Sequence, residues 1–132
     1  MTPEATFEQS PDWLVVRARG AGDTAGLKDL LGRIAAAARE APSGAVLADI
    51  REVTATLTLV DRYDIGVFAA ALRFPGPLAV IAAEQVLDPQ RFAELVARNR
   101  GANVRGFTDP EAARRWLREQ MALRLRGGAQ RT

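Results

Sequence analysis

Hydrophobic and polar residues follow two different periods along the chain, and these periods predict which segments form strands and which form helices. Short apolar runs that end at Pro, Gly or Asp are typical of strands, whereas apolar residues spaced three and four apart are typical of helices. The predicted strands are residues 5–10, 13–20, 45–50, 78–83 and 103–107. The predicted helices are residues 25–40, 60–72, 87–101 and a last helix that begins at residue 110.

The order of these elements determines the expected fold class. Strands 5–10 and 13–20 are joined by the tight turn Pro11-Asp12, so they must be antiparallel. The later strands alternate with helices, which indicates parallel pairing. We therefore predict an α/β fold with a single mixed sheet of about five strands and about four helices. The sheet is expected to be mostly parallel, with an antiparallel hairpin at its N-terminal edge.

Several predicted helices begin with a residue that can cap the free backbone N–H groups of a first turn. The candidate caps are Thr24, Asp88 and either Thr108 or Asp109. In helix 60–72 the spacing predicts one apolar face, formed by Val60, Tyr63, Val67, Phe68, Ala71 and Leu72. The ring of Tyr63 is therefore expected to pack in the core. Trp116 is expected to be buried in the last helix.

Length and composition indicate one globular domain. The chain has 132 residues, 48% of them hydrophobic and 26% charged, which are ordinary values for such a domain. We expect a single domain over residues 1–124 and a flexible tail over residues 125–132. The N-terminal residues lack the basic and apolar segments of a secretory signal, and no apolar run approaches the roughly 20 residues of a membrane span. A cytoplasmic protein without membrane insertion is the simplest expectation.

Two residue types are absent, and their absence narrows the chemistry. Without cysteine there is no disulfide or thiolate chemistry, and without histidine the commonest general base and metal ligand are missing. The glycines at 20, 22 and 26 fit neither a phosphate-binding loop nor a dinucleotide motif. Asp61 and Asp64 lie at the start of a predicted helix and make a poor acid–base pair, because that chemistry needs two carboxyl groups with separated pKa values in one cavity. The spacing of Asp49, Asp61 and Asp64 is not diagnostic of a magnesium site. We expect no enzyme activity, no catalytic residue, no cofactor and no metal.

Charge is distributed unevenly between the two halves of the chain. Residues 1–66 hold 7 basic and 10 acidic side chains, a net −3, while residues 67–132 hold 11 and 6, a net +5. Such asymmetry indicates either an anion-facing surface or a solvated face. Nucleic-acid binding would need exposed aromatic side chains among the arginines. Trp116 is the nearest candidate and its spacing buries it, so we expect no nucleic-acid partner.

Four segments of the chain together resemble a known family. They are "VLADIREV" (46–53), "VDRYDIGVFAAAL" (60–72), "LAVIAA" (78–83) and "VRGFTDPEAARRWL" (104–117). In this order they resemble the STAS-type fold of the SpoIIAA-like proteins, which are bacterial anti-sigma-factor antagonists and their uncharacterised relatives. The resemblance covers about residues 5–120. Residues 107–117 are especially typical of the uncharacterised branch, and the resemblance implies a STAS/SpoIIAA-like fold with a binding function.

The regulatory branch of this family carries a phosphorylation switch, which this chain matches only in part. There, the central strand ends in an aspartate, and a turn resembling D-S-S-G-L-G follows at the helix start. A partner kinase phosphorylates one of its serines. The resemblance places Asp49 at the strand end and residues 61–66 on the turn, so Arg62 and Tyr63 replace the serines. The serine switch is then not expected to operate, although a shifted alignment would bring Thr54, Thr56 or Thr58 near the site.

The candidate site lies between the central strand and the helix that follows it. Ligands of open α/β sheets gather at the carboxyl ends of parallel strands, which favours a binding role there. The alternative is structural: a local charge pair after the strand, and acidic residues that stabilise the first turn of a helix. The candidate ligand- or partner-binding residues are Asp49, Arg51, Thr54, Asp61, Arg62, Tyr63 and Asp64.

These observations lead to a STAS/SpoIIAA-like binding module for a small apolar ligand or a protein partner. The alternative is a regulator of the anti-sigma-factor-antagonist type, which acts through protein contacts around residues 49–66 without the usual serine. A ligand module predicts an apolar pocket beneath residues 51–66. A docking module predicts an exposed patch on the helix that begins at Val60. An enzyme predicts polar groups with perturbed pKa values that converge on one site. The sequence also leaves open whether the protein forms a homodimer.

Overall fold

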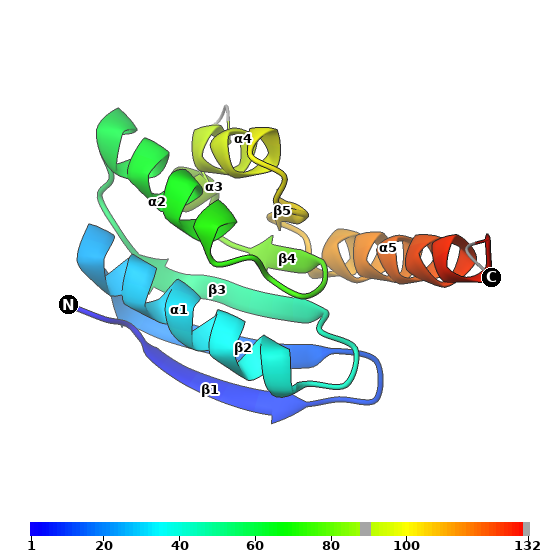
Figure 1. Ribbon diagram of the computed structural model, residues 1–132. Helices are drawn as coiled ribbons and strands as arrows, with labels where there is room; N and C mark the ends of the chain where they lie inside the picture. Colours follow the sequence, from blue (N-terminus) through cyan, green and yellow to red (C-terminus); the bar gives the residue numbers. More distant parts are fainter. Residues whose placement is uncertain (88–90, 131–132) are drawn as a thin grey trace.

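Five strands form one sheet in the order β1-β2-β3-β4-β5 in the computed structural model, which describes residues 1–87 and 91–130 (Figure 1). The strands are β1 (Glu4–Gln9), β2 (Leu14–Ala21), β3 (Val46–Thr54), β4 (Leu78–Ile81) and β5 (Val104–Phe107). The helices are α1 (Thr24–Glu40), α2 (Leu59–Ala71), α3 (Glu84–Leu87), α4 (Phe92–Asn99) and α5 (Pro110–Gln130).

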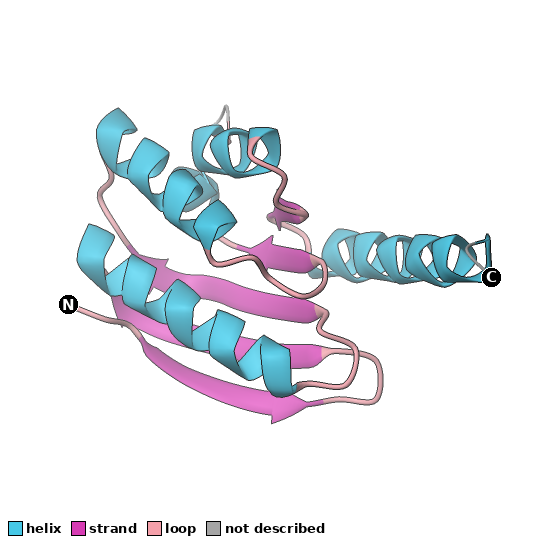
Figure 2. Ribbon diagram, in the orientation of Figure 1, coloured by secondary structure: helices cyan, strands magenta, loops and turns pink. Residues whose placement is uncertain are grey.

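The pairing of the strands confirms the predicted fold class. β1 pairs with β2 antiparallel, and β2 through β5 pair in parallel. Because the strand order follows the sequence and parallel crossovers are right-handed, the connecting helices must fall on one face of the sheet. Figure 2 shows α1 and α2 together on the near face, while α5 extends past the end of the sheet where β3 and β4 begin.

Two apolar layers separate the helices from the sheet. On one face, α1 packs against β2, β3 and β4 through Leu27, Leu30, Ile34, Val16, Ala48 and Leu78. On the other face, α5 packs mainly against β4 and β5 through Trp116, Leu117, Leu47, Ala79 and Ile81. Trp116 is 8% exposed, which confirms its predicted burial. Both faces of the central strands are therefore covered, as their continuous apolar runs indicate.

The structure differs from the sequence prediction at several element ends. β3 continues to Thr54, so residues 51–54 are strand and not loop, and a register shift near Arg17 keeps Val53 buried. Asp23, and not Thr24, caps α1 by accepting from the Gly26 N–H. α3 is a short helix that the spacing did not predict, and the expected cap Asp88 lies outside the described residues.

The predicted apolar face of α2 is wrong at its first turns. Val60 is 68% exposed and Tyr63 is 43% exposed. The inner face is formed instead by Gly66, Ala69 and the partly buried Ile65. Small residues allow α2 to approach α4 closely, because a Cβ at Gly66 would lie 2.6 Å from the Ala93 carbonyl oxygen. Close helix approach, rather than hydrophobicity, determines how α2 is rotated.

The C-terminal helix is longer than the sequence indicates. α5 continues to Gln130, so most of the expected tail of residues 125–132 lies in this helix, and residues 131–132 lie outside the described ones. Asp109 caps α5 by accepting from the backbone N–H groups of Glu111 and Ala112, both at 3.3 Å. Within the described chain, none of the helices has the length and apolarity needed to span a bilayer.

Candidate functional site

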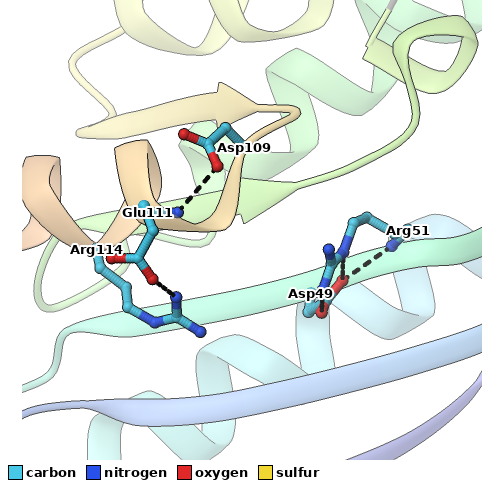
Figure 3. Close-up of polar contacts among 5 residues, drawn as sticks. All are labelled: Asp49, Arg51, Asp109, Glu111 and Arg114. Carbon is cyan, nitrogen blue, oxygen red and sulfur yellow. Dashed lines mark hydrogen bonds and ion pairs between the residues drawn. The ribbon is translucent and has the colours of Figure 1, made fainter.

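Asp49 and Arg51 pair with each other on β3. The Asp49 carboxylate accepts from the Arg51 guanidinium at 2.9 and 2.6 Å and from the Arg51 backbone N–H at 3.2 Å (Figure 3). This side-chain hydrogen bond with Arg51, more than their charge attraction, holds the pKa of Asp49 below its usual value. The arrangement is the local charge pair that the sequence left as the alternative to a binding role.

The sheet separates this pair from the predicted site residues of α2. Asp49 lies directly opposite Ile81 of β4, and directly opposite residues share a face of the sheet. Ile81 packs with α5, whereas α2 covers the other face. Asp49 and Arg51 therefore lie on the α5 face, away from Asp61 and its neighbours.

A second cluster of polar contacts lies on the α5 face at the start of that helix. Figure 3 shows Asp109 bound to the Glu111 backbone and Glu111 paired with Arg114, apart from the Asp49–Arg51 pair. Each of these contacts joins residues within three positions of each other. They stabilise the first turn of α5 and leave no carboxylate aimed at a shared ligand position.

Thr58 and Asp61 form a capping box at the start of α2. The Thr58 hydroxyl accepts from the Asp61 N–H at 3.1 Å, and the Asp61 carboxylate accepts from the Thr58 N–H at 2.8 Å. The bond from the Thr58 backbone holds the pKa of Asp61 below its usual value. Because α2 begins at Leu59, the hydroxyl at the helix start belongs to Thr58, and Arg62 and Tyr63 lie inside the helix.

Arg62 and Tyr63 connect α2 to its neighbours in the structure. The Arg62 guanidinium donates to the carbonyl oxygens of Val86 at 2.7 Å and Gln85 at 3.1 Å, so it links α2 to α3. The Tyr63 hydroxyl accepts from Arg100 at 2.9 Å. These contacts account structurally for two of the predicted site residues.

The two remaining candidate residues are Asp64 and Thr54. The half-buried Asp64 lies in the second turn of α2, and the exposed Thr54 ends β3 with its carbonyl accepting from Gly22 N–H at 2.9 Å. Of the seven candidates, Arg62 alone lines the apolar cavity described next.

An apolar cavity of about 150 Å³ lies between the sheet and helices α1, α2, α3 and α4. Its lining is aliphatic apart from the charged side chains of Arg62 and Glu94. The Glu94 carboxylate accepts from the Gly106 N–H and lies 3.7 Å from Arg98. The pocket expected beneath residues 51–66 is therefore present, although sequence reasoning named no lining residue except Arg62.

Small residues create this cavity. The lining includes Ala48, Gly66, Ala69, Ala93, Ala97 and Gly106. A Cβ at Gly106 would lie 2.6 Å from a methyl carbon of Leu87, so the glycine is needed for the close packing of α3 on β5. A recurrence of Ala and Gly on the strands and helices that surround the cavity was the available sequence signal. In the described segments no group of three or more acidic residues is placed to hold a metal ion.

The comparisons with known proteins concern the fold. No protein-family model and no curated protein matches the chain. Among solved structures, an anti-sigma factor antagonist from Mycobacterium paratuberculosis matches with a TM-score of 0.56 and 18% identity, over 89% of this chain and 95% of that chain. An uncharacterized protein of the DUF3478 family with a SpoIIAA-like fold, from Shewanella loihica PV-4, matches with a TM-score of 0.51 and 20% identity, over 88% and 93%. The chain has a SpoIIAA-like fold, as the sequence resemblance implied.

Proposed function

We propose that this SpoIIAA-like domain is a non-enzymatic binding module whose ligand is a small apolar molecule held beneath α2. The observation that carries the proposal is the cavity of about 150 Å³ between the helices and the sheet. An engineered cavity of this size and lining binds benzene in another protein, so the ligand has about six to eight carbon atoms. Arg62 and Glu94 supply the few polar groups that small-molecule sites use to orient a ligand.

A ligand in this pocket removes apolar surface from water. The aliphatic side chains that line a partly open pocket contact water, and covering them with an apolar ligand is favourable.

The lowered pKa values of three aspartates argue against a role for them as general acids. Asp23, Asp49 and Asp61 have lowered pKa values because each carboxylate accepts hydrogen bonds from nearby N–H groups. Such bonds stabilise the charged form and match structural roles. A general acid needs the opposite shift, and the chain has no histidine or cysteine to replace it.

The test uses benzene as a probe and thermal unfolding as the measurement. A saturating probe stabilises the folded protein by about 2.7 kcal/mol at 100 times its Kd. Ala97→Leu places a larger side chain in the cavity, so it is expected to raise Tm by itself and to abolish the effect of benzene. Ala36→Leu makes the same change at an exposed position of α1 and is the matched control.

A second cavity variant keeps the test decisive. Ala48→Val fills the space from β3, in case leucine at position 97 disturbs α4. The proposal is wrong if benzene leaves Tm of the wild type unchanged while both filled variants are more stable. Native mass spectrometry of protein purified gently from its own host then reads the mass of any natural ligand.

A specific observation favours the antagonist-type regulator as the second candidate. Leu59 and Val60 are 64% and 68% exposed, directly after the exposed Thr58 that caps α2. These two neighbouring apolar side chains are accessible to a protein partner at the helix start. A phosphate on Thr58 would add nearly two negative charges beside Asp61. The intact mass of the protein from its host, compared with the Thr58→Val variant, tests whether this hydroxyl carries a phosphate.

A further inference from the structure

Another hollow, of about 430 Å³, lies at the end of the sheet where β4 and β5 begin, next to the apolar cavity, with which it shares Ala69, Leu78 and Val104. Its walls are the chain segments that follow α2 and α4, together with Arg124 of α5. Figure 1 shows the segment after α2 and the helix α5 at this same end of the molecule. We infer that this hollow is an anion site that binds the phosphate group of a small phosphomonoester.

The charge of the hollow is the first argument. Arg73, Arg100 and Arg124 line it, and its described lining contains no carboxylate. The C-terminal ends of α2 and α4 contribute about half a negative charge each, which leaves an excess of about two positive charges. The hollow therefore concentrates part of the net +5 of residues 67–132. The sequence analysis gave an anion-facing surface as one interpretation of the uneven charge, and we assign that surface to this hollow.

Two of the three guanidinium groups already make hydrogen bonds to the protein. Arg124 donates to the carbonyl oxygens of Ser43 at 3.0 Å and Pro75 at 3.5 Å. Gly76 leaves room for it, because a Cβ there would lie 2.8 Å from Arg124 Nη1. Arg100 donates to the Tyr63 hydroxyl and lies 5.8 Å from the centre of that ring. A guanidinium has five N–H donors, so both keep donors for an anion.

Arg73 occupies a backbone position that favours glycine. Its φ is 52°, in the left-handed region, directly after the C-cap residue Leu72. Glycine is the usual residue at this point of a helix end, because a side chain there is strained by about 1 kcal/mol or more. Its guanidinium makes no hydrogen bond or ion pair within residues 1–87 and 91–130. Retaining an arginine against local strain is typical of a functional side chain.

The chemistry and size of the hollow indicate the ligand class. Guanidinium groups bind phosphate oxygens through paired N–H donors, which makes arginine the common choice for phosphate recognition. A volume of about 430 Å³ exceeds the needs of inorganic phosphate and falls in the range of small-molecule sites. Phe74 lines the hollow and offers a surface for the organic part. A free metabolite and a lipid headgroup can both present this phosphomonoester.

The experiment is a calorimetric titration with glycerol 3-phosphate, with inorganic phosphate as the smaller probe. We expect binding that weakens as salt increases, because the attraction is electrostatic. Arg73→Gly and Arg100→Gln are each expected to weaken it by about tenfold. Arg118→Gln removes the same charge from an exposed position of α5 outside the hollow, and it is expected to retain wild-type affinity.

The outcomes distinguish a specific anion site from a positively charged surface that attracts anions without a defined site. Equal weakening by Arg118→Gln and Arg73→Gly overturns the inference, and so does the absence of binding to both soluble probes and to vesicles. Phosphatidylcholine vesicles with and without phosphatidic acid form the second arm. Binding to phosphatidic acid that depends on Arg73, without binding of glycerol 3-phosphate, identifies a lipid headgroup as the source of the phosphate. Benzene binding in Arg73→Gly reports separately on the apolar cavity.

Discussion

The two ends of the sheet hold their charged residues in opposite ways. At the end where the parallel strands finish, the carboxyl end, Asp49 pairs with Arg51, and the Asp61 carboxylate accepts from the Thr58 backbone. At the amino end, three arginines from three separate segments line one hollow whose described lining has no carboxylate. At the first end two opposite charges close in sequence pair with each other, whereas at the second end the fold brings like charges together.

Distance along the sequence accounts for the difference between the two ends. Residues that form a visible motif are near each other in the chain, so opposite charges among them can pair locally and stabilise a turn or a strand end. Like charges collected from distant segments keep their potential and raise the local concentration of an anion. We therefore expect substitutions at the carboxyl end to lower stability and substitutions of the three arginines to leave stability intact or to raise it.

The largest expected effect comes from removing the anchor of α5. Leu117 is fully buried against the sheet, and α5 carries Arg124 to the amino end. Leu117→Ala is expected to lower the free energy of unfolding by about 2–5 kcal/mol, because it removes a core side chain and leaves a cavity. Urea denaturation measures this change.

A matched control lies on the same helix. Leu123 is 53% exposed, so Leu123→Ala makes the same chemical change with little buried surface to lose. We expect a change within about 0.5 kcal/mol. Equal losses for the two variants would mean that α5 is not anchored through Leu117, and the position of Arg124 at the amino end would lose its support.

The fold was largely predictable because its signals are local and periodic. Alternation and buried runs located the strands, and Pro11-Asp12 fixed the antiparallel hairpin. The rotation of α2 was not predictable from hydrophobicity, since Gly66 and Ala69 face inward while Val60 and Tyr63 face outward. Small residues carry a weak hydrophobic signal, yet they decide which face of a helix can approach another helix closely.

The candidate site was predictable only where its residues adjoin in sequence. The sequence placed Asp49 and Arg51 at the end of the central strand, but β3 continues to Thr54, so both lie inside it. Their mutual pairing and their face of the sheet depend on strand register. Arg73, Arg100 and Arg124 belong to no motif and meet only when α2, α4 and α5 are packed. The charge asymmetry of the two halves was the one sequence signal that pointed toward them.

The next expected effect tests whether the carboxyl end is structural. Thr58→Ala removes the side-chain cap of α2, and it is expected to lower the free energy of unfolding by about 1 kcal/mol. Thr58→Ser keeps a hydroxyl and is expected to restore most of the loss. Thr56→Ala, at an exposed loop position, is the control in the same denaturation series. A Thr58→Ala variant as stable as the control would contradict a capping role.

The amino end is expected to respond with the opposite sign. Arg73→Gly relieves the left-handed backbone strain and removes one of three like charges, so we expect a gain of about 0.5–1 kcal/mol. Arg73→Ala removes the same charge but keeps the strain, and comparing the two by thermal unfolding separates backbone from charge. A clear loss of stability in both variants would show that Arg73 serves the fold, and the contrast between the two ends would fail.

The smallest expected effect depends on pH. The pKa of Asp49 is lower in the folded protein than in the unfolded chain, so its ion pair with Arg51 stabilises the fold above the unfolded value of 3.8. That contribution is lost as the pH falls through the folded pKa.

Asp49→Asn is therefore expected to lower the free energy of unfolding by about 0.5 kcal/mol near pH 7, a small value because the pair is partly exposed. Below the folded pKa of Asp49 the variant and the wild type should converge. Arg51→Gln and the double variant complete the cycle: if the two single losses simply add, the pair is not coupled, and local neutralisation would not describe the carboxyl end.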